Sequence, residues 1–350
     1  MTDRGLVLAA AGAAPELEPI ELDPPGEGEV LVRVTAAGVC HTDLHVVETG
    51  GWGLRLPVLL GHEVAAVVEQ PGAGVDALAP GDAVVLAWRV PCGRCAACAR
   101  GAPRRCRTPK RAKRRARRAA DGAQLTPALL VGGFATRLVV HAEQAVRVPP
   151  ELPPEQACLL GCAVATGVGA ALHTARIWEG ARVGVVGCGG VGLAAVQGAR
   201  IAGAGEILAV DVAPEKREQA LRFGATDAPA VLPEDAQLDF VLDAVGRPAT
   251  VEAAARALGH GGVLVLVGIP RPGDEARLDL GRLFDARAEV RVSHGGDHLP
   301  AEDVPLLARL ALEGRLDLGG MVSRTLPLAD AAAAVADVGR GGAIRTVVLP

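Results

Sequence analysis

The chain of 350 residues contains no tyrosine, and aromatic residues make up only 2% of it. Its densest basic segment, residues 104–118, holds ten lysines and arginines, no acidic residue and no aromatic side chain on which a nucleic-acid base could stack. Because the formal net charge is −4, the rest of the chain sums to −4 − 10 = −14. We therefore expect no nucleic-acid partner. Runs of like charge are usually solvated, so we expect an exposed loop here, with contact to an anionic substrate as the alternative.

An obvious secretory signal is also lacking, since the short apolar run Leu6–Ala14 is better interpreted as a first strand and turn. The longest uncharged stretch, Gln156–Ala175, reaches the nominal length of a membrane span. Its glycines, together with Cys162 and His173, indicate instead that this segment is buried inside the protein, next to a functional site. Eight cysteines without a signal favour metal binding in a reducing compartment over disulfides. We expect a cytoplasmic protein that does not enter a membrane.

The length and the 50% hydrophobic content predict two domains. The first part has short β-type runs separated by Gly and Pro turns, which predicts an antiparallel, barrel-like region. These runs are Val30–Val34, Val64–Val68, Ala83–Ala87 and Arg137–Val140. From Arg182 onward, apolar strands alternate with helical stretches, as in a parallel, doubly wound sheet. The expected strands are Val183–Val186, Ile207–Val210, Phe240–Leu242 and Val263–Val267, and the expected helices are Val191–Ala202 and Glu215–Phe223. The last apolar run, Arg345–Leu349, predicts a strand that rejoins the first domain.

Four cysteines follow one another at a spacing typical of a structural zinc site. Cys92, Cys95, Cys98 and Cys106 form the pattern Cys-x2-Cys-x2-Cys-x7-Cys. Four thiolates fill the tetrahedral coordination shell of Zn²⁺ and leave no position for a substrate. The segment of about residues 90–108 is therefore predicted to be a structural zinc lobe.

A glycine pattern predicts a dinucleotide site. Gly187, Gly189 and Gly192 form G-x-G-x-x-G directly after a predicted strand and at the start of a helix. The first glycine permits a tight turn, the second lets a pyrophosphate approach the backbone, and the third allows close packing of helix on strand. Asp211 follows the next strand, where a carboxylate accepts hydrogen bonds from ribose hydroxyls and repels a 2′-phosphate. NAD is thus favoured over NADP, and the nearby Lys216 and Arg217 are the argument for NADP.

A second set of possible zinc ligands is scattered along the chain. Cys40, His62 and Cys162 make a Cys₂His set, which leaves the fourth position open and is the arrangement of catalytic zinc. Glu63 could approach the metal from its far side or orient the ligands, and Asp43 could hold the ring N–H of His62. Together with the cofactor motif, these residues predict metal-assisted hydride transfer.

Five segments make the chain resemble the zinc-containing medium-chain alcohol dehydrogenases over nearly its whole length. They are Gly38–His45, Gly61–Glu63, the four-cysteine lobe, Gly161–Cys162 and Gly187–Gly192. The resemblance implies a GroES-like antiparallel β-barrel catalytic domain of residues 1–160 and 294–350, and a Rossmann coenzyme domain with a doubly wound parallel sheet of residues 161–293. It differs at Ala66, where the family usually has glycine.

The family's site residues can be placed on this sequence by the same resemblance. It implies catalytic zinc at Cys40, His62 and Cys162, structural zinc at the four-cysteine lobe, and a proton relay through Thr42 and His45. The implied cofactor contacts are His41, Thr166, Gly187, Gly189, Gly190, Val191, Gly192, Asp211, Lys216, Val267, Ile269 and Arg345. Arg345 would meet the cofactor phosphates.

The expected activity is reversible, NAD-dependent oxidation of a small alcohol to an aldehyde or ketone, with two zinc ions per chain. Short matches at Val84–Arg89 and Gly296–Pro300 are similar to mycothiol-dependent formaldehyde dehydrogenases, so oxidation of a thiol–formaldehyde adduct is an alternative. A non-catalytic nucleotide-binding homologue is a third. We also expect a homo-oligomer, either a dimer or a tetramer.

Overall fold

The computed structural model describes residues 2–338 and 342–350, and the chain divides into two compact units. Unit 1 contains the chain up to Cys162 together with Leu299–Pro350, and unit 2 is Ala163–His298. The expected boundaries were 160/161 and 293/294, so Cys162 lies in unit 1 and not in the coenzyme domain, whereas residues 294–298 lie in unit 2 and not in the catalytic domain.

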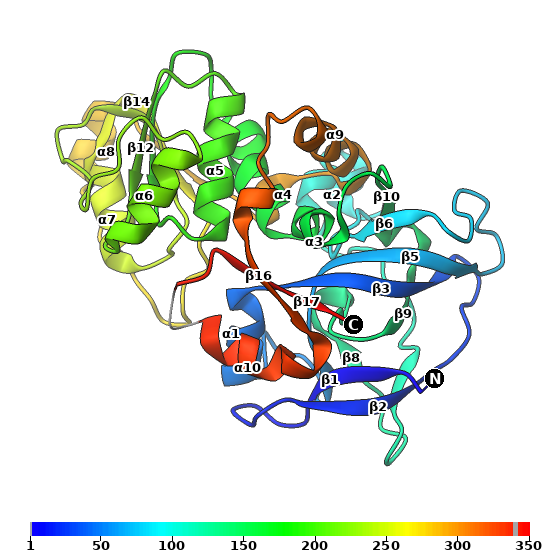
Figure 1. Ribbon diagram of the computed structural model, residues 1–350. Coiled ribbons are helices and arrows are strands. Elements are labelled where there is room, and N and C mark those ends of the chain that lie inside the picture. The colour runs from blue at the N-terminus through cyan, green and yellow to red at the C-terminus, as the bar shows by residue number, and fades with distance from the viewer. Residues whose placement is uncertain (1, 339–341) are drawn as a thin grey trace. The chain divides into compact units, whose positions relative to one another are not determined.

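Unit 1 is built on two sheets (Figure 1). The five-stranded sheet has the order β7-β2-β1-β4-β8, and the seven-stranded sheet has the order β10-β6-β5-β3-β17-β16 with β9 also paired to β3. The strands are β1 Arg4–Leu8, β2 Glu16–Leu22, β3 Glu29–Val39, β4 Val58–Leu59, β5 Glu63–Pro71, β6 Ala83–Leu86, β7 Ala116–Arg118, β8 Thr126–Pro127, β9 Arg137–His141, β10 Ala145–Arg147, β16 Val322–Pro327 and β17 Arg345–Leu349. The four runs predicted in the first part of the chain are therefore confirmed as strands.

The core of unit 1 follows from the period of two along the long strand β3. Val30, Val32 and Val34 are buried, and they pack with Val64, Leu86 and other apolar residues of the neighbouring strands. Strands β5 and β9 both pair with β3 in antiparallel register. The predicted C-terminal strand is confirmed as β17, which runs antiparallel to β3 and parallel to β16 (Figure 1).

Short helices connect the strands of unit 1 and place its polar side chains. The α-helices are α1 His41–Thr49, α2 Ala96–Ala99, α3 Pro154–Ala157, α9 Pro300–Leu312 and α10 Ala331–Asp337. The 3-10 helices are η1 Pro103–Arg105, η2 Ala128–Leu130, η3 Ala142–Gln144, η4 Cys158–Gly161, η7 Gly319–Met321 and η8 Leu328–Asp330. Helix α1 starts where β3 ends, η4 packs on β5, and Gly38 of β3 pairs with Glu63 of β5, so one end of the long sheet leads into the candidate site described below.

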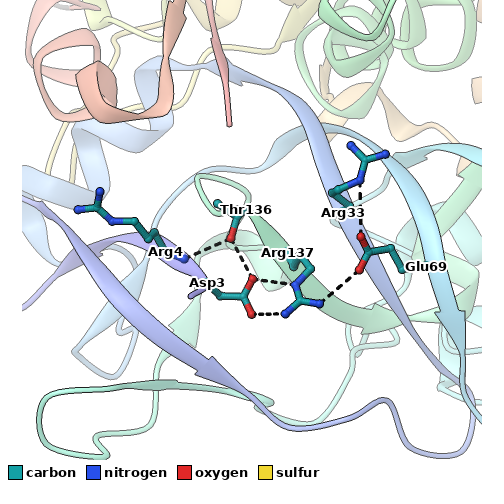
Figure 2. Close-up of polar contacts among 6 residues, drawn as sticks. All are labelled: Asp3, Arg4, Arg33, Glu69, Thr136 and Arg137. Atoms are coloured by element: carbon teal, nitrogen blue, oxygen red, sulfur yellow. Dashed lines mark hydrogen bonds and ion pairs between the residues drawn. The ribbon is translucent and has the colours of Figure 1, made fainter. Parts of the chain in front are cut away.

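A polar cluster ties the N-terminal segment to the long sheet (Figure 2). The Arg137 guanidinium, on β9, donates to both carboxylate oxygens of Asp3, at 2.8 and 2.7 Å. It also lies 3.5 Å from Glu69 of β5, which in turn pairs with Arg33 of β3. The Thr136 hydroxyl donates to Asp3 at 3.0 Å. Hydrogen bonds from Arg137 and Thr136 lower the pKa of Asp3 against the raising effect of burial.

Unit 2 contains a parallel sheet of order β12-β11-β13-β14-β15. Its strands are β11 Arg182–Val186, β12 Glu206–Val210, β13 Leu238–Asp243, β14 Leu258–Leu266 and β15 Glu289–Val292. Its helices are α4 Ala163–Gly169, the π-helix η5 Ala170–Ala175, α5 Gly190–Ile201, α6 Pro214–Arg222, α7 Pro248–Arg256, α8 Leu280–Ala286 and the 3-10 helix η6 Gly295–Asp297. An isolated parallel bridge joins Leu208 of β12 to Asp227, so the third strand of a doubly wound order is reduced to one bridge.

Among the described residues, no single helix has both the length and the apolar composition that a membrane span requires. The bent pair of Pro154–Gly161 and Ala163–Ala175 meets these criteria only when its two helices are joined.

Candidate metal centres and coenzyme site

The four cysteines of the lobe lie together, as their spacing predicts. Their sulfur atoms all lie within 4.8 Å of one another. The Sγ of Cys95 is 3.6 Å from that of Cys98 and 3.9 Å from that of Cys106. With Zn–S bonds of about 2.3 Å, the edge of a tetrahedron of sulfurs is about 3.8 Å. The arrangement therefore fits four thiolates around one zinc ion.

Backbone and hydroxyl donors point at these sulfurs. The amide of Cys92 donates to the Sγ of Cys106 at 3.3 Å. The Sγ of Cys92 accepts the amide of Cys95 at 3.2 Å and the Thr108 hydroxyl at 3.3 Å. The Thr108 hydroxyl and nearby amides lower the pKa of Cys92 to about 5. Burial and the neighbouring Cys95 raise the pKa of Cys98 to about 11. Donors that favour thiolates suit a metal site, because a metal binds the deprotonated form.

The scattered ligand candidates also meet, inside unit 1. Cys40 follows β3 and caps the start of α1, His62 directly precedes β5, Glu63 begins β5, and Cys162 follows η4. All four are buried, and one ligand atom from each lies within 4.8 Å of the others. Three connections that are distant in sequence thus bring two thiols, one imidazole and one carboxylate to one point.

Asp43 orients this cluster. One of its carboxylate oxygens lies 3.1 Å from Nδ1 of His62, and the other accepts the backbone amide of Cys40 at 3.0 Å. Burial alone would lower the pKa of His62, but the Asp43 carboxylate and Cys40 raise it well above its ordinary value. Nε2 of His62 is buried and has no hydrogen-bond partner among the described residues. A buried imidazole held through Nδ1 with Nε2 left over is the usual form of a zinc ligand.

Arg345 reaches the same cluster from β17. Its guanidinium lies 3.4 Å from the carboxylate of Glu63 and 4.0 Å from the Sγ of Cys40. Burial raises the pKa of Glu63 to about 7, although Arg345 opposes this. Burial would lower the pKa of Arg345, but Glu63 and Cys40 hold it above its ordinary value. The family resemblance implies a contact of Arg345 with the cofactor phosphates, whereas the structure places it against Glu63 and Cys40.

The two thiols of the cluster interact strongly. The thiol of Cys162 donates to Cys40, and this bond together with the charge of Arg345 lowers the pKa of Cys40 well below its ordinary value despite burial. The same contact and burial raise the pKa of Cys162 well above its own. The lowered pKa of Cys40 favours its thiolate, which is the form that a metal binds.

The relay candidates all lie on α1, which starts at the Cys40 cap. Thr42 and His45 are three positions apart, on one face of the helix, and both are partly exposed, whereas His41 is exposed. The imidazole of His45 stacks on the indole of Trp52, with ring centroids 4.7 Å apart. Sequence reasoning had assigned Trp52 no role.

The glycine loop has the backbone that its sequence predicts. Gly187 follows β11 with φ of 90°, a conformation that favours glycine. A Cβ at Gly192 would lie 1.7 Å from the carbonyl oxygen of Gly187, so only glycine lets the helix pack this closely. A Cβ at Gly189 would meet no described atom within 4 Å, which leaves that backbone open to a ligand. Gly190 and Val191 begin α5, and no described side chain caps its N-terminus.

Asp211 follows β12 and braces this loop. Its carboxylate accepts the amide of Cys188 at 2.9 Å and that of Ala213 at 3.0 Å. The Arg217 guanidinium folds back onto the carbonyl of Asp211 at 3.0 Å, and Lys216 lies beside it on α6. The bracing role of Asp211 was missed, because an aspartate at this position is ordinarily explained by ribose binding alone.

Three other cofactor candidates also lie in unit 2. Val267 is buried directly after β14, and its amide donates to the carbonyl of Asp243 at 2.9 Å. Ile269, two residues further, is exposed. Since the strands are parallel, these residues share the carboxyl edge of the sheet with the glycine loop. Thr166 is buried on α4.

Only half of the cations in the basic segment, residues 104–118, are solvated as expected. Five of its ten cations form salt bridges to acids elsewhere in unit 1, and these are Arg104, Lys110, Arg115, Arg117 and Arg118. The other five are exposed and form no salt bridge within the described chain, and these are Arg105, Arg107, Arg111, Lys113 and Arg114. The most buried anchor is Glu29, which accepts the Nε of Arg115 and the amide of Lys113, both at 2.7 Å. The expectation of an exposed loop therefore applies to one half of the cations.

Comparison with known proteins agrees with this geometry. Residues 26–150 match the family "Alcohol dehydrogenase GroES-like domain", and residues 190–313 match the family "Zinc-binding dehydrogenase". The chain is 36% identical over 353 residues to alcohol dehydrogenase B of Mycobacterium tuberculosis, covering 95% of this chain and 94% of that protein. It is 33% identical over 370 residues to S-(hydroxymethyl)glutathione dehydrogenase of Escherichia coli, covering 99% of this chain and all of that one.

A solved structure extends the comparison to three dimensions. The crystal structure of an alcohol dehydrogenase zinc-binding domain protein from Burkholderia ambifaria superposes with a TM-score of 0.94 at 36% identity, covering 100% of this chain and 99% of that chain. The chain therefore belongs to the zinc-containing medium-chain alcohol dehydrogenase family. Its fold is the family's combination of a GroES-like unit and a Rossmann unit, as predicted.

Proposed function

We propose that this family member is an NAD-dependent alcohol dehydrogenase that interconverts an alcohol with its aldehyde or ketone and holds two zinc ions per chain. The observation that carries the proposal is the buried cluster of Cys40, His62 and Cys162, in which Nε2 of His62 has no partner among the described residues. Three such ligands leave one position of a tetrahedral ion for a substrate oxygen.

Each protein group of this site has a defined task. Cys40, His62 and Cys162 would hold zinc, which would act as a Lewis acid on the substrate oxygen. The Asp43 carboxylate, 3.1 Å from Nδ1 of His62, favours the tautomer that carries its proton on Nδ1 and would present Nε2 as a ligand. Arg345 pairs with Glu63 and lies next to Cys40, so its positive charge offsets part of the negative charge of the buried cluster.

The proton of the alcohol needs a path to solvent, and α1 offers one. Thr42 can pass a proton through its hydroxyl, and His45 can release it to water because its imidazole is partly exposed. The helix begins at the Cys40 cap, so the relay and one metal ligand are positioned by the same turn of backbone.

Unit 2 supplies the features that a dinucleotide needs. The open backbone at Gly189 and the uncapped start of α5 suit a pyrophosphate, and the Asp211 carboxylate suits ribose hydroxyls. Bound NAD would accept the hydride. The charge of Asp211 favours NAD over NADP, because it would repel a 2′-phosphate.

We further propose that the four-cysteine lobe holds the second zinc ion in a structural role. The separations of 3.6 and 3.9 Å between sulfurs support it, since a disulfide would need about 2.05 Å. All eight cysteines lie within the described residues and are free, which also fits the reducing cytoplasm in which we place the protein.

Two apolar surfaces of unit 2 support a homo-oligomer, either a dimer or a tetramer. Strand β15 pairs only with β14 among the described strands, and its Val290 and Val292 are exposed. Leu280 and Phe284, one turn apart on α8, are exposed as well. An unpaired apolar strand edge is a ready site for a second copy of the chain. Sedimentation analysis of Val292→Lys should then show a smaller assembly than the parent protein.

A second candidate substrate is a formaldehyde adduct of a carrier thiol, either glutathione or mycothiol. Two observations favour it: the relative in Escherichia coli is named for S-(hydroxymethyl)glutathione, and five cations of the basic segment have no salt bridge within the described chain. Replacing Arg105, Arg107 and Arg111 with glutamine should raise the KM of an anionic adduct, more steeply at low salt, and leave a simple alcohol unaffected. Equal effects on both substrates would indicate a structural role of the segment.

Steady-state turnover tests the proposal directly. We expect NADH formation from NAD with at least one of a panel of simple alcohols, and loss of that activity after chelation of the metal. Formaldehyde with and without glutathione or mycothiol decides between the two substrate classes. Zinc-loaded protein that binds NAD but turns over none of these compounds would make it a non-catalytic nucleotide-binding homologue.

A further inference from the structure

The stack of His45 on Trp52 joins a relay candidate to a side chain with no assigned role. The ring centroids are 4.7 Å apart and the ring planes make an angle of 28°. This separation is typical of an attractive aromatic pair. The indole is 53% exposed, so burial of apolar surface gives only a partial reason for its position.

The backbone after α1 brings the two rings together. Helix α1 ends at Thr49, its C-cap Gly50 has φ of 78°, and Gly51 follows with φ of 67°. Two consecutive left-handed residues turn the chain back, so that Trp52 returns to the helix seven positions after His45. Glycine is required for this turn, because other residues adopt such angles only at a cost.

Thr49 links this turn to the backbone of His45. Its hydroxyl donates to the carbonyl of His45 at 2.8 Å and accepts the amide of Gly51 at 3.1 Å. The amide of Gly50 also donates to the carbonyl of Val46 at 2.9 Å. The turn that carries Trp52 is therefore fastened to the residue whose ring the indole covers.

We propose that Trp52 is a positioning residue that holds the imidazole of His45 in the orientation needed for proton exit. A partly exposed side chain on a helix would otherwise exchange among rotamers, and the stack holds the imidazole in one of them. Stacking covers the ring face and leaves the nitrogens at the ring edge free to take and release a proton. The proposal rests on the role of His45 in the proposed function.

Kinetics of Trp52 variants test the role. Trp52→Ala should lower kcat between about twofold and tenfold at unchanged KM, in line with the strength of an aromatic pair. Trp52→Phe, which keeps a flat ring, should restore most of the rate, whereas Trp52→Leu should behave like Trp52→Ala. Trp178 is a matched control, because it is 52% exposed and packs edge-on against Phe240 in unit 2. Trp178→Ala should leave kcat unchanged.

A double-mutant cycle shows whether Trp52 acts through His45. In a His45→Gln background, Trp52→Ala should cause no further loss of kcat. Full additivity of the two losses would overturn the proposal. A change of KM that depends on the size of the alcohol, with kcat unchanged, would also overturn it and make Trp52 a substrate contact.

A spectroscopic signature of the stack does not depend on turnover. In histidine-labelled protein, the ring protons of His45, assigned through His45→Gln, should shift upfield because of the indole ring current, and Trp52→Leu should abolish this shift. Absence of the shift would overturn the proposal. Wild-type protein with the shift but without alcohol turnover would overturn the proposed function and the positioning role together. Active wild-type protein with unchanged kcat in Trp52→Ala would overturn the positioning role alone.

Discussion

The ligands of the cysteine lobe lie within one short segment, Cys92 to Cys106, whereas those of the buried cluster extend from Cys40 to Cys162. The lobe is partly exposed and has little regular structure beyond α2 and η1, so its own backbone amides supply the donors to sulfur. The cluster is buried and stands on β3, β5 and η4, and side chains from elsewhere, Asp43 and Arg345, orient its ligands.

The two sites differ in whether the metal stabilises the fold or the fold positions the ligands. The lobe has too few apolar residues to hold its shape, so a metal there would contribute directly to folding free energy. The packed strands around the buried cluster hold its ligands in place, so the ligands stay together without a metal as long as the sheet is folded. We expect loss of metal to unfold the first site locally and only to inactivate the second.

The largest effect is expected at the buried cluster. Cys40→Ala should lower kcat/KM for any alcohol more than about a thousandfold, because zinc contributes several kcal/mol to stabilising the transition state. The circular dichroism spectrum and NAD binding should remain those of the parent protein, and the zinc content should fall from two to one per chain. A well-folded variant that retains activity would show that the cluster is not the catalytic centre.

The lobe should respond in the opposite way. Cys92→Ala should lower the thermal midpoint by roughly 5 °C or more, since a structural ligand set contributes to stability. The molecules that stay folded should keep most of their kcat. Cys158→Ala, which changes a buried cysteine outside both sets, controls for the removal of a thiol. If Cys92→Ala abolished kcat without loss of stability, the two roles would have to be exchanged.

The coenzyme loop of unit 2 is intermediate between the two metal sites in how far apart its residues lie in the sequence. It is a local glycine motif that one more distant side chain, Asp211, holds by hydrogen bonds. Asp211→Gly should raise the ratio of kcat/KM for NADP to that for NAD about tenfold or more, by removing charge repulsion. Asp211→Asn separates charge from bracing, since its carbonyl oxygen can still accept one of the two backbone amides. A parent protein that already prefers NADP would contradict the assignment.

The smallest effect is expected at the polar cluster of Figure 2, whose side chains come from the N-terminal segment and from strands β3, β5 and β9. Its neighbours hold the pKa of Asp3 below the ordinary value of 3.8, so its contribution to stability is present above that pH and is lost as pH falls through the lower folded value. Asp3→Asn should cost ~1 kcal/mol at neutral pH, and the difference from wild type should shrink below about pH 4. Denaturant titrations at several pH values measure it.

Two controls decide whether the Asp3 effect has the cause given. Asp121→Asn alters an exposed pair with Arg118 and should change stability little at any pH. Addition of a chelator should not alter the difference between wild type and Asp3→Asn. A difference that is independent of pH would mean that ionisation of Asp3 is not its source.

Local patterns predicted the fold better than they predicted contacts. The lobe cysteines, the glycine loop and strands such as β11 and β12 were evident because their signals lie within a few residues. Strand β14 begins at Leu258, five residues before the predicted start, and three of the five added residues are glycines, which strands usually lack. These residues pair with β13 through an irregular register that no local pattern shows.

Contacts between distant residues could not be predicted from the sequence. Arg345 and Glu63 are 282 positions apart, and nothing near either residue indicates the other. The same holds for Arg115 and Glu29, 86 positions apart, whose pairing turns part of an apparently solvated basic run into an anchor. The position of Trp52 was missed because a half-exposed aromatic after two glycines carries no periodic signal.

The strand β17 that brings Arg345 to Cys40 and Glu63 has a consequence for biosynthesis. Arg345 is translated 183 residues after Cys162 (345 − 162), with all of unit 2 in between. At 5–20 residues per second, that is about 10 to 40 seconds in which the other members of the cluster already exist as nascent chain. Until β17 is added, any metal captured by Cys40 and His62 meets a site without its guanidinium, so the buried centre is completed only after the coenzyme unit has been made.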